Sequence, residues 1–242
     1  MKRATILVAL FGPLMVLCAR AQDMTLTAHV SMSSHDGKSA RESKSANVVL
    51  WLTPTDGAAH MSGVSFSQQH PRLVQINKSF QPHILIVPVG SVVEFPNHDP
   101  FFHNVFSLFE GKRFDLGLYE AGTSRDVRFD KPGVSYIFCN IHPQMSGVVL
   151  ALDTPYYGIS DRKGQVVIPN VPAGHYALHI WYEAALPDTL KGLVRDVAIA
   201  PNSSTLGLLR LVADDVPQTH KNKYGQDYDA PTPAQSPAYD QR

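Results

Sequence analysis

The sequence predicts an all-β fold arranged as a β-sandwich. Short runs of β-branched and aromatic residues recur along the chain, and Gly, Pro and Asn separate them. No long stretch shows the 3.6-residue period of an amphipathic helix. With 242 residues, 44% of them hydrophobic, the chain is long enough for one or two domains with ordinary cores. We therefore expect packed β-sheets to form each core.

The expected strands follow one another between residues 25 and 152. Residues 25–30 alternate polar and apolar side chains, and residues 47–52 form a continuous β-rich run. Pro88-Val89-Gly90 and Asp130-Lys131-Pro132-Gly133 are turn sequences between later strands. Those later strands are expected at 72–76, 83–87, 91–95, 125–129, 134–138 and 147–152.

Residues 157–212 show a different pattern, in which turn sequences lead into strands. Asp161-x-x-Gly164 precedes a run at 165–168, and Val171-Pro172-x-Gly174-x-Tyr176 leads into a run at 175–181. This pattern resembles the small transthyretin-like or carboxypeptidase-regulatory-like β-sandwich. Two further strands are expected at 194–199 and 206–212, with a helical turn near 183–190.

That resemblance implies a discontinuous second sandwich, because its first strands correspond to the runs near the N-terminus. We expect it to combine residues 23–60 with 153–212, and the segment 71–152 to be inserted between its halves. The alternative is two β-sheets that share one core. Residues 213–242 are polar and nearly free of aliphatic side chains, so they predict a disordered tail.

The first 21 residues predict a signal peptide. Lys2 and Arg3 precede an apolar run at 4–17, and Ala19 and Ala21 are the small residues that a signal peptidase reads. We expect cleavage after Ala21 and a periplasmic or secreted protein, with no membrane span left in the mature chain.

Charge and cysteine content narrow the function of the mature chain. The formal net charge of the whole sequence is zero, which gives no indication of nucleic-acid or anionic-membrane binding. Of the two cysteines, Cys18 lies in the expected leader, so the mature chain keeps Cys139 alone. A single cysteine in an exported chain cannot form an internal disulfide, and metal ligation is one reason for its presence.

The most informative motif is Cys139-x2-His142-x2-Met145, with His103 lying 36 positions before the cysteine. Two imidazoles, one thiolate and one thioether form the ligand set of a mononuclear blue-copper site. Cys139 ends an expected strand, His142 and Met145 lie on the turn that follows, and His103 comes from another part of the sandwich. We therefore predict His103, Cys139, His142 and Met145 as ligands of one copper ion.

Three alternatives remain for these residues. A thiol hydrolase could use Cys139 and His142, but it also needs an oxyanion hole and a positioned base. A zinc site is possible in principle, although structural zinc prefers more cysteines and does not recruit Met. The third alternative is a degenerate domain of the same fold that binds no metal.

The segment from about Arg72 to Leu152 resembles a cupredoxin of the plastocyanin, amicyanin and pseudoazurin group. The resemblance rests on the run 90–97, on His103-Asn104-Val105 and on the short Cys139–Met145 ligand loop. It implies nitrogen ligands at His103 and His142, a thiolate at Cys139 and a long axial bond to Met145. It also implies a hydrogen bond from the backbone amide of Asn104 to the Cys139 sulfur. The mature chain as a whole is similar to plastocyanin-like proteins called methylamine utilization proteins, a name that establishes no part in methylamine oxidation.

The function expected from these features is one-electron transfer through Cu(I) and Cu(II), with a cytochrome or an oxidoreductase as redox partner. We expect no enzymatic activity, because four protein ligands leave no open position for a substrate. Copper trafficking or sensing in the cell envelope would use the same ligands. A glycan- or protein-binding module is the third possibility, with Trp51, Trp181, Tyr156 and Tyr157 as an aromatic platform.

Overall fold

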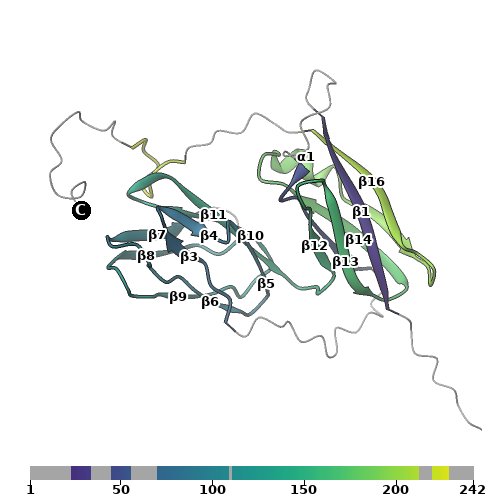
Figure 1. The fold of residues 1–242 in the computed structure, drawn as a ribbon, viewed down its shortest axis with the longest axis horizontal. Coiled ribbons are helices and arrows are strands. Elements are labelled where there is room, and N and C mark those ends of the chain that lie inside the picture. The colour runs from purple at the N-terminus through teal and green to yellow at the C-terminus, as the bar shows by residue number, and fades with distance from the viewer. Residues whose placement is uncertain (1–22, 34–44, 56–69, 109–110, 213–219, 229–242) are drawn as a thin grey trace, which may run out of the picture.

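The computed structural model describes residues 23–33, 45–55, 70–108, 111–212 and 220–228 (Figure 1). These residues form an all-β structure, as the sequence predicts. The one α-helix among them, α1 (Pro187–Lys191), has five residues, so no described helix could cross a membrane. The expected signal peptide lies outside the described residues.

The strands, in chain order, are β1 (Met24–Ser33), β2 (Val49–Pro54), β3 (Val74–Ile76), β4 (Ser79–Gln81), β5 (Ile84–Pro88), β6 (Val92–Glu94), β7 (His103–Ser107), β8 (Phe114–Tyr119), β9 (Asp126–Arg128), β10 (Gly133–Cys139), β11 (His142–Leu152), β12 (Tyr157–Ile159), β13 (Gln165–Val171), β14 (Gly174–Trp181), β15 (Arg195–Ile199) and β16 (Thr205–Val212). They form three larger sheets and two strand pairs among the described residues.

A five-stranded sheet of order β5-β11-β10-β7-β8 carries the candidate site. The pairs β3–β4 and β6–β9 lie on one of its faces (Figure 1). Side chains from both layers form one buried cluster, in which Leu85, Ile137 and Val149 of the sheet meet Val93 and Phe129. This half of the molecule is therefore a β-sandwich with its own core.

The strands near the N-terminus join the strands that follow residue 157. Strand β1 lies between β13 and β16, and β2 lies between β12 and β14 in a four-stranded sheet that ends with β15. A second buried cluster fills the space between these sheets, and it includes Leu26, Val30, Leu50, Leu178 and Leu209. Side chains of β1 alternate between buried and exposed, as a strand with one buried face requires. We propose domain limits at 23–60, 71–152 and 153–212, as expected from the sequence.

The expected turn motifs form hydrogen-bonded corners in this second half. The Asp161 side chain accepts hydrogen bonds from the backbone amides of Lys163 and Gln165, at 2.8 and 2.9 Å. Gly164 has a φ of +77°, and a Cβ there would lie 2.1 Å from the carbonyl oxygen of Val30. Only glycine fits this close approach.

A third buried cluster joins the two halves. In β5, Leu85 belongs to the cluster beneath the site, whereas Ile84 and Ile86 belong to a cluster that also contains Val49 and Trp181. Because neighbouring side chains in a strand point to opposite faces, the five-stranded sheet is covered on both sides there. The described residues thus form three buried clusters, one in each half and one between them.

Several elements differ from the sequence expectation. Strands β4, β7, β8 and β12 were not anticipated, and β11 begins at His142 rather than at residue 147. The reason for the early start is that His142 pairs with Cys139 across the turn formed by Asn140 and Ile141. Residues 220–228, inside the predicted disordered tail, hold a defined position and contact the rest of the chain. The other residues of that tail lie outside the described ones.

Candidate metal centre

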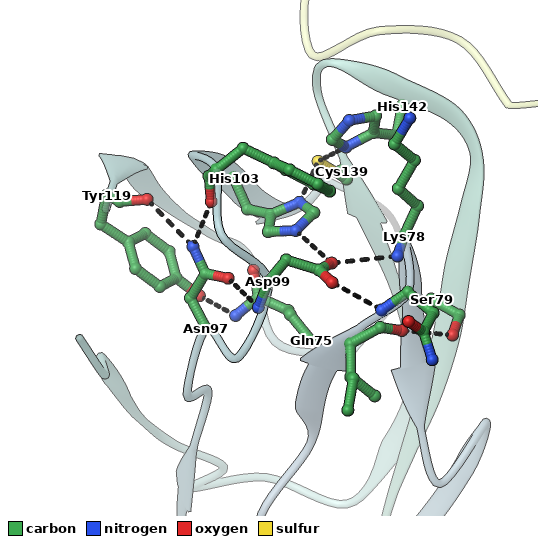
Figure 2. A network of polar contacts seen from close by, with 12 residues as sticks. Gln75, Lys78, Ser79, Asn97, Asp99, His103, Tyr119, Cys139 and His142 are labelled. Atoms are coloured by element: carbon green, nitrogen blue, oxygen red, sulfur yellow. Dashed lines mark hydrogen bonds and ion pairs between the residues drawn. The ribbon is translucent and has the colours of Figure 1, made fainter. Parts of the chain in front are cut away.

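Three strand ends bring His103, Cys139 and His142 together (Figure 2). His103 is the first residue of β7, Cys139 the last of β10 and His142 the first of β11. Strand β7 pairs with β10, where Cys139 lies opposite Val105. Backbone pairing therefore places all three side chains at the same end of one sheet.

The distances within this cluster suit a single metal ion. The Nδ1 atom of His103 lies 3.4 Å from the Cys139 sulfur, and Nδ1 of His142 lies 3.4 Å from the same atom. The three donor atoms all lie within 4.8 Å of one another. The two imidazole rings are 4.9 Å apart between centroids, inclined at 59°. Two nitrogen atoms thus face one sulfur atom from different sides.

Met145 follows His142 by three residues along β11, and its side chain is 1% exposed. It belongs to the same buried cluster as Cys139 and Val105. The structure thus places Met145 inside the core next to the strand end that carries the site. Its role as a ligand remains a prediction.

Burial keeps the three donors uncharged in the absence of a metal. Desolvation lowers the pKa of His103, and together with the nearby His103 ring it lowers the pKa of His142 to about 4. Burial raises the pKa of the Cys139 thiol. Hydrogen bonds from the backbone of Ile141, Asn104 and His142 lower this pKa, but by less than burial raises it. Neutral imidazoles have free lone pairs near neutral pH, whereas the thiol must lose its proton to bind a metal.

The backbone around Cys139 is tied to the neighbouring strand. Asn140 donates a backbone hydrogen bond of 2.8 Å to the carbonyl oxygen of Asn104, next to His103. The Asn104 amide is among the backbone groups that hydrogen-bond the sulfur, as the resemblance to cupredoxins implies. The turn that carries Cys139 and His142 is therefore fixed to β7.

Asp99 is a functional candidate that sequence reasoning missed. Its Oδ2 atom lies 2.9 Å from Nε2 of His103, on the side of the ring away from the sulfur. The carboxylate also accepts hydrogen bonds from the backbone amides of Asn77 and Lys78, at 2.6 and 2.9 Å. No local spacing could have indicated this, because the two amides lie more than 20 positions earlier in the chain.

Residues 220–228, here called the C-terminal strap, lie against the site from outside the sheet (Figure 1). The Tyr228 hydroxyl donates a hydrogen bond of 2.8 Å to the carbonyl oxygen of Cys139. The backbone amide of Lys223 donates to Asn140 Oδ1 at 2.9 Å. The His220 ring stacks on Phe138, with centroids 4.3 Å apart. The strap therefore contacts the cysteine turn at several points.

Aromatic and aliphatic side chains surround the cluster. Phe101 lies 5.3 Å from His103 and 5.6 Å from His142, measured between ring centroids. Phe102 and Ile141 are 39% and 45% exposed, whereas Phe106 is buried. The side chains around the cluster are therefore divided between surface and core.

The all-β fold and the His–Cys–His cluster define this chain as a β-sandwich protein with a candidate mononuclear metal site. Among solved structures, the copper-containing nitrite reductase of Thermus scotoductus SA-01 is 27% identical over 35% of this chain and 22% of its own, with a TM-score of 0.33. A purple cupredoxin from Nitrosopumilus maritimus is 26% identical over 34% of this chain and 98% of its own, with a TM-score of 0.31. A reduced amicyanin variant is 20% identical over 37% of this chain and 87% of its own, with a TM-score of 0.33.

No protein-family model and no curated protein matches the chain. The match to the nitrite reductase spans 22% of that enzyme's length.

Proposed function

We propose that this chain is a type-1 copper protein that carries single electrons, with one copper ion held by His103, Cys139, His142 and Met145. The observation that supports this best is the buried cluster of two imidazoles around one cysteine sulfur. When bound, copper supplies a one-electron couple between Cu(II) and Cu(I).

The donor set fits copper better than the alternatives. A thiolate and a thioether are soft ligands that suit Cu(I), and imidazole suits both oxidation states. Structural zinc sites use four Cys or His ligands, and only three such residues gather here among the described ones. A nucleophilic cysteine needs a lowered pKa and access to substrate, but Cys139 is fully buried and burial raises its pKa.

The surrounding chain is suited to hold these ligands still. His103, Cys139 and His142 lie on paired strands rather than on a free loop, and the turn between the last two is tied to Asn104. Sites built on regular elements keep their geometry better than sites on loops. Little movement of the ligands between oxidation states would favour fast electron exchange.

His142 is the proposed route for electrons. His103 and Cys139 are fully buried, whereas His142 is partly exposed and lies beside the exposed side chain of Ile141. A redox partner, such as a cytochrome or an oxidoreductase, would approach this edge through a small and transient contact. We further propose export to the periplasm or the exterior, on the basis of the leader sequence at residues 1–21.

Electron transfer and copper trafficking make different demands on the same ligands, and one pair of measurements separates them. Copper-loaded protein is examined by voltammetry and then mixed with a chelating acceptor. Electron transfer predicts reversible reduction and slow loss of copper to the acceptor. Rapid loss without reversible reduction would contradict this function and favour trafficking, and Cys139→Ser provides the redox-silent control.

The glycan-binding alternative has less support from side-chain positions. Trp181 and Tyr156 are buried, at 3% and 6% exposure, and Trp51 stacks on His179 with centroids 5.0 Å apart. Buried rings cannot form a platform for a sugar. Glycan binding that persists in Cys139→Ser would nevertheless support that alternative.

A further inference from the structure

The buried carboxylate of Asp99 is the feature of this molecule that the ligand set alone does not explain. Asp99 is 4% exposed, and a buried carboxylate is costly unless charge-assisted hydrogen bonds compensate for its lost hydration. Here three donors surround it: the ring of His103 and the backbone amides of Asn77 and Lys78. Figure 2 shows the carboxylate between His103 and the turn that carries Lys78.

The turn that supplies the two amides has an unusual backbone. Asn77 and Lys78 connect β3 to β4, with φ of 54° and 53°. Asn adopts this left-handed conformation readily, but a long side chain such as Lys does so at a cost. Residues in such conformations persist where surrounding contacts fix them, and they occur often at functional sites. The contacts here are the pairing of β3 with β4, in which Ile76 lies opposite Ser79, and the two hydrogen bonds to Asp99.

A second contact sets the position of Asp99 from its own loop. The Asn97 side chain accepts a hydrogen bond of 3.0 Å from the Asp99 backbone amide and donates one of 2.8 Å to the carbonyl oxygen of Phe101. Asn97 is itself fully buried. The loop before β7 is therefore braced on both sides of the carboxylate.

The carboxylate determines which nitrogen of His103 carries the proton. Both oxygens of the Asp99 side chain accept hydrogen bonds from backbone amides, Oδ1 from Asn77 and Oδ2 from Lys78, and this ring of donors suits a carboxylate. An ionised carboxylate accepts hydrogen bonds only, which requires a proton on Nε2 of His103. The other nitrogen, Nδ1, then directs its lone pair toward the Cys139 sulfur, 3.4 Å away.

We propose that Asp99 is a positioning residue, which fixes His103 as an Nδ1 ligand and whose negative charge favours Cu(II) over Cu(I). This proposal rests on the copper function proposed above. A carboxylate that accepts a hydrogen bond from a ligating imidazole increases the basicity of the ring. A more basic ring strengthens the binding of Cu(II) more than that of Cu(I), because Cu(II) carries the higher charge. The site should therefore have a lower reduction potential than the same ligands would give without Asp99.

The test compares Asp99→Asn with the wild-type protein. Asn has nearly the same shape and can still accept a hydrogen bond from His103, but it carries no charge. We expect Cu(II) affinity, measured by competition with a chelator, to fall tenfold or more, with a smaller change for Cu(I). If the Cu(II) affinity falls tenfold more than the Cu(I) affinity, the reduction potential of the variant rises by about 59 mV, because the couple transfers one electron. Asp130→Asn, an equal charge change at a surface ion pair with Lys112, should leave both quantities unchanged.

A second measurement needs no copper and separates this proposal from the proposed function. Nitrogen NMR of the metal-free protein should show His103 protonated at Nε2 alone, and Asp99→Ala should mix the two ring tautomers. Absence of copper binding by the wild type would contradict the proposed function, while the NMR result would still decide the positioning role. An Asp99→Asn potential equal to the wild-type value, together with an unchanged tautomer in Asp99→Ala, would overturn the inference.

Discussion

The hydroxyl of Tyr228 donates a hydrogen bond of 2.8 Å to the carbonyl oxygen of Cys139, 89 positions earlier in the chain. This contact joins the C-terminal strap to the turn that positions two of the three clustered donors. A partly buried hydrogen bond of this kind contributes about 1 kcal/mol to stability. The strap therefore adds a restraint to the metal site from outside the sheet.

Replacing Tyr228 with Phe tests this restraint. The change removes only the hydroxyl, so we expect unfolding in urea to require about 1 kcal/mol less free energy and copper to pass to a chelator faster. Tyr224→Phe is the matched control, because its side chain is 72% exposed in the same strap. Equal effects of the two substitutions would show that the bond to Cys139 has no special importance.

Replacing Met145 with Leu tests the axial ligand. The side chains have similar volumes, so stability should change by less than about 1.5 kcal/mol. The reduction potential should rise, because the weak sulfur donor stabilises Cu(II) more than Cu(I) and Leu offers no donor. Met32→Leu, at an equally buried position in the other core, should leave the potential unchanged. An unaltered potential in Met145→Leu would remove Met145 from the ligand set.

The metal-free protein should lose stability as the pH falls from 6.5 toward 4. Burial, with the neighbouring His103 ring, lowers the pKa of His142 from 6.5 to about 4, and burial also lowers that of His103. In this range the unfolded chain binds more protons than the folded one, so acidification favours unfolding. Melting temperatures measured across the range should fall less steeply in His142→Gln. Parallel curves for the two proteins would contradict the assignment of a neutral, partly buried His142.

The stability of the sheet that carries the site should also depend on the buried cluster between the two halves, which contains Val49, Leu150 and Trp181. Leu150 is fully buried between them, so Leu150→Ala should cost about 2–5 kcal/mol through lost contacts and a cavity. Leu118→Ala, at a side chain 58% exposed, should cost less than about 0.5 kcal/mol. Similar losses measured by denaturant unfolding would show that this cluster contributes little.

Strands with one buried face could be predicted from the sequence. The alternation at 25–30 corresponds to the alternating burial of β1, which extends three residues further. Strand β7 gave no such signal, because all five of its residues are buried and His103, Asn104 and Ser107 are polar. Alternation disappears when both faces of a strand are covered. Polar residues in such a strand are recognised only from the partners that the fold supplies.

In the site too, contacts between residues close in sequence could be predicted, whereas contacts between distant segments could not. The spacing of Cys139 and His142 predicted their meeting, because a two-residue turn places them opposite each other. Asp99 depends on amides in a distant turn, so its role follows from tertiary structure alone. The strap was also missed, since residues 220–228 make their contacts through polar and aromatic groups rather than through the aliphatic side chains used to predict a core.

The most direct test of the copper proposal is the visible absorption spectrum of the protein loaded with Cu(II), recorded beside that of Cys139→Ser. A thiolate bound to Cu(II) gives an intense charge-transfer band, whereas a serine hydroxyl cannot replace the soft ligand. We predict a strong visible band in the wild-type protein and none in the variant. A colourless wild-type protein, or a band that survives in Cys139→Ser, would contradict the assignment of Cys139 as a copper ligand.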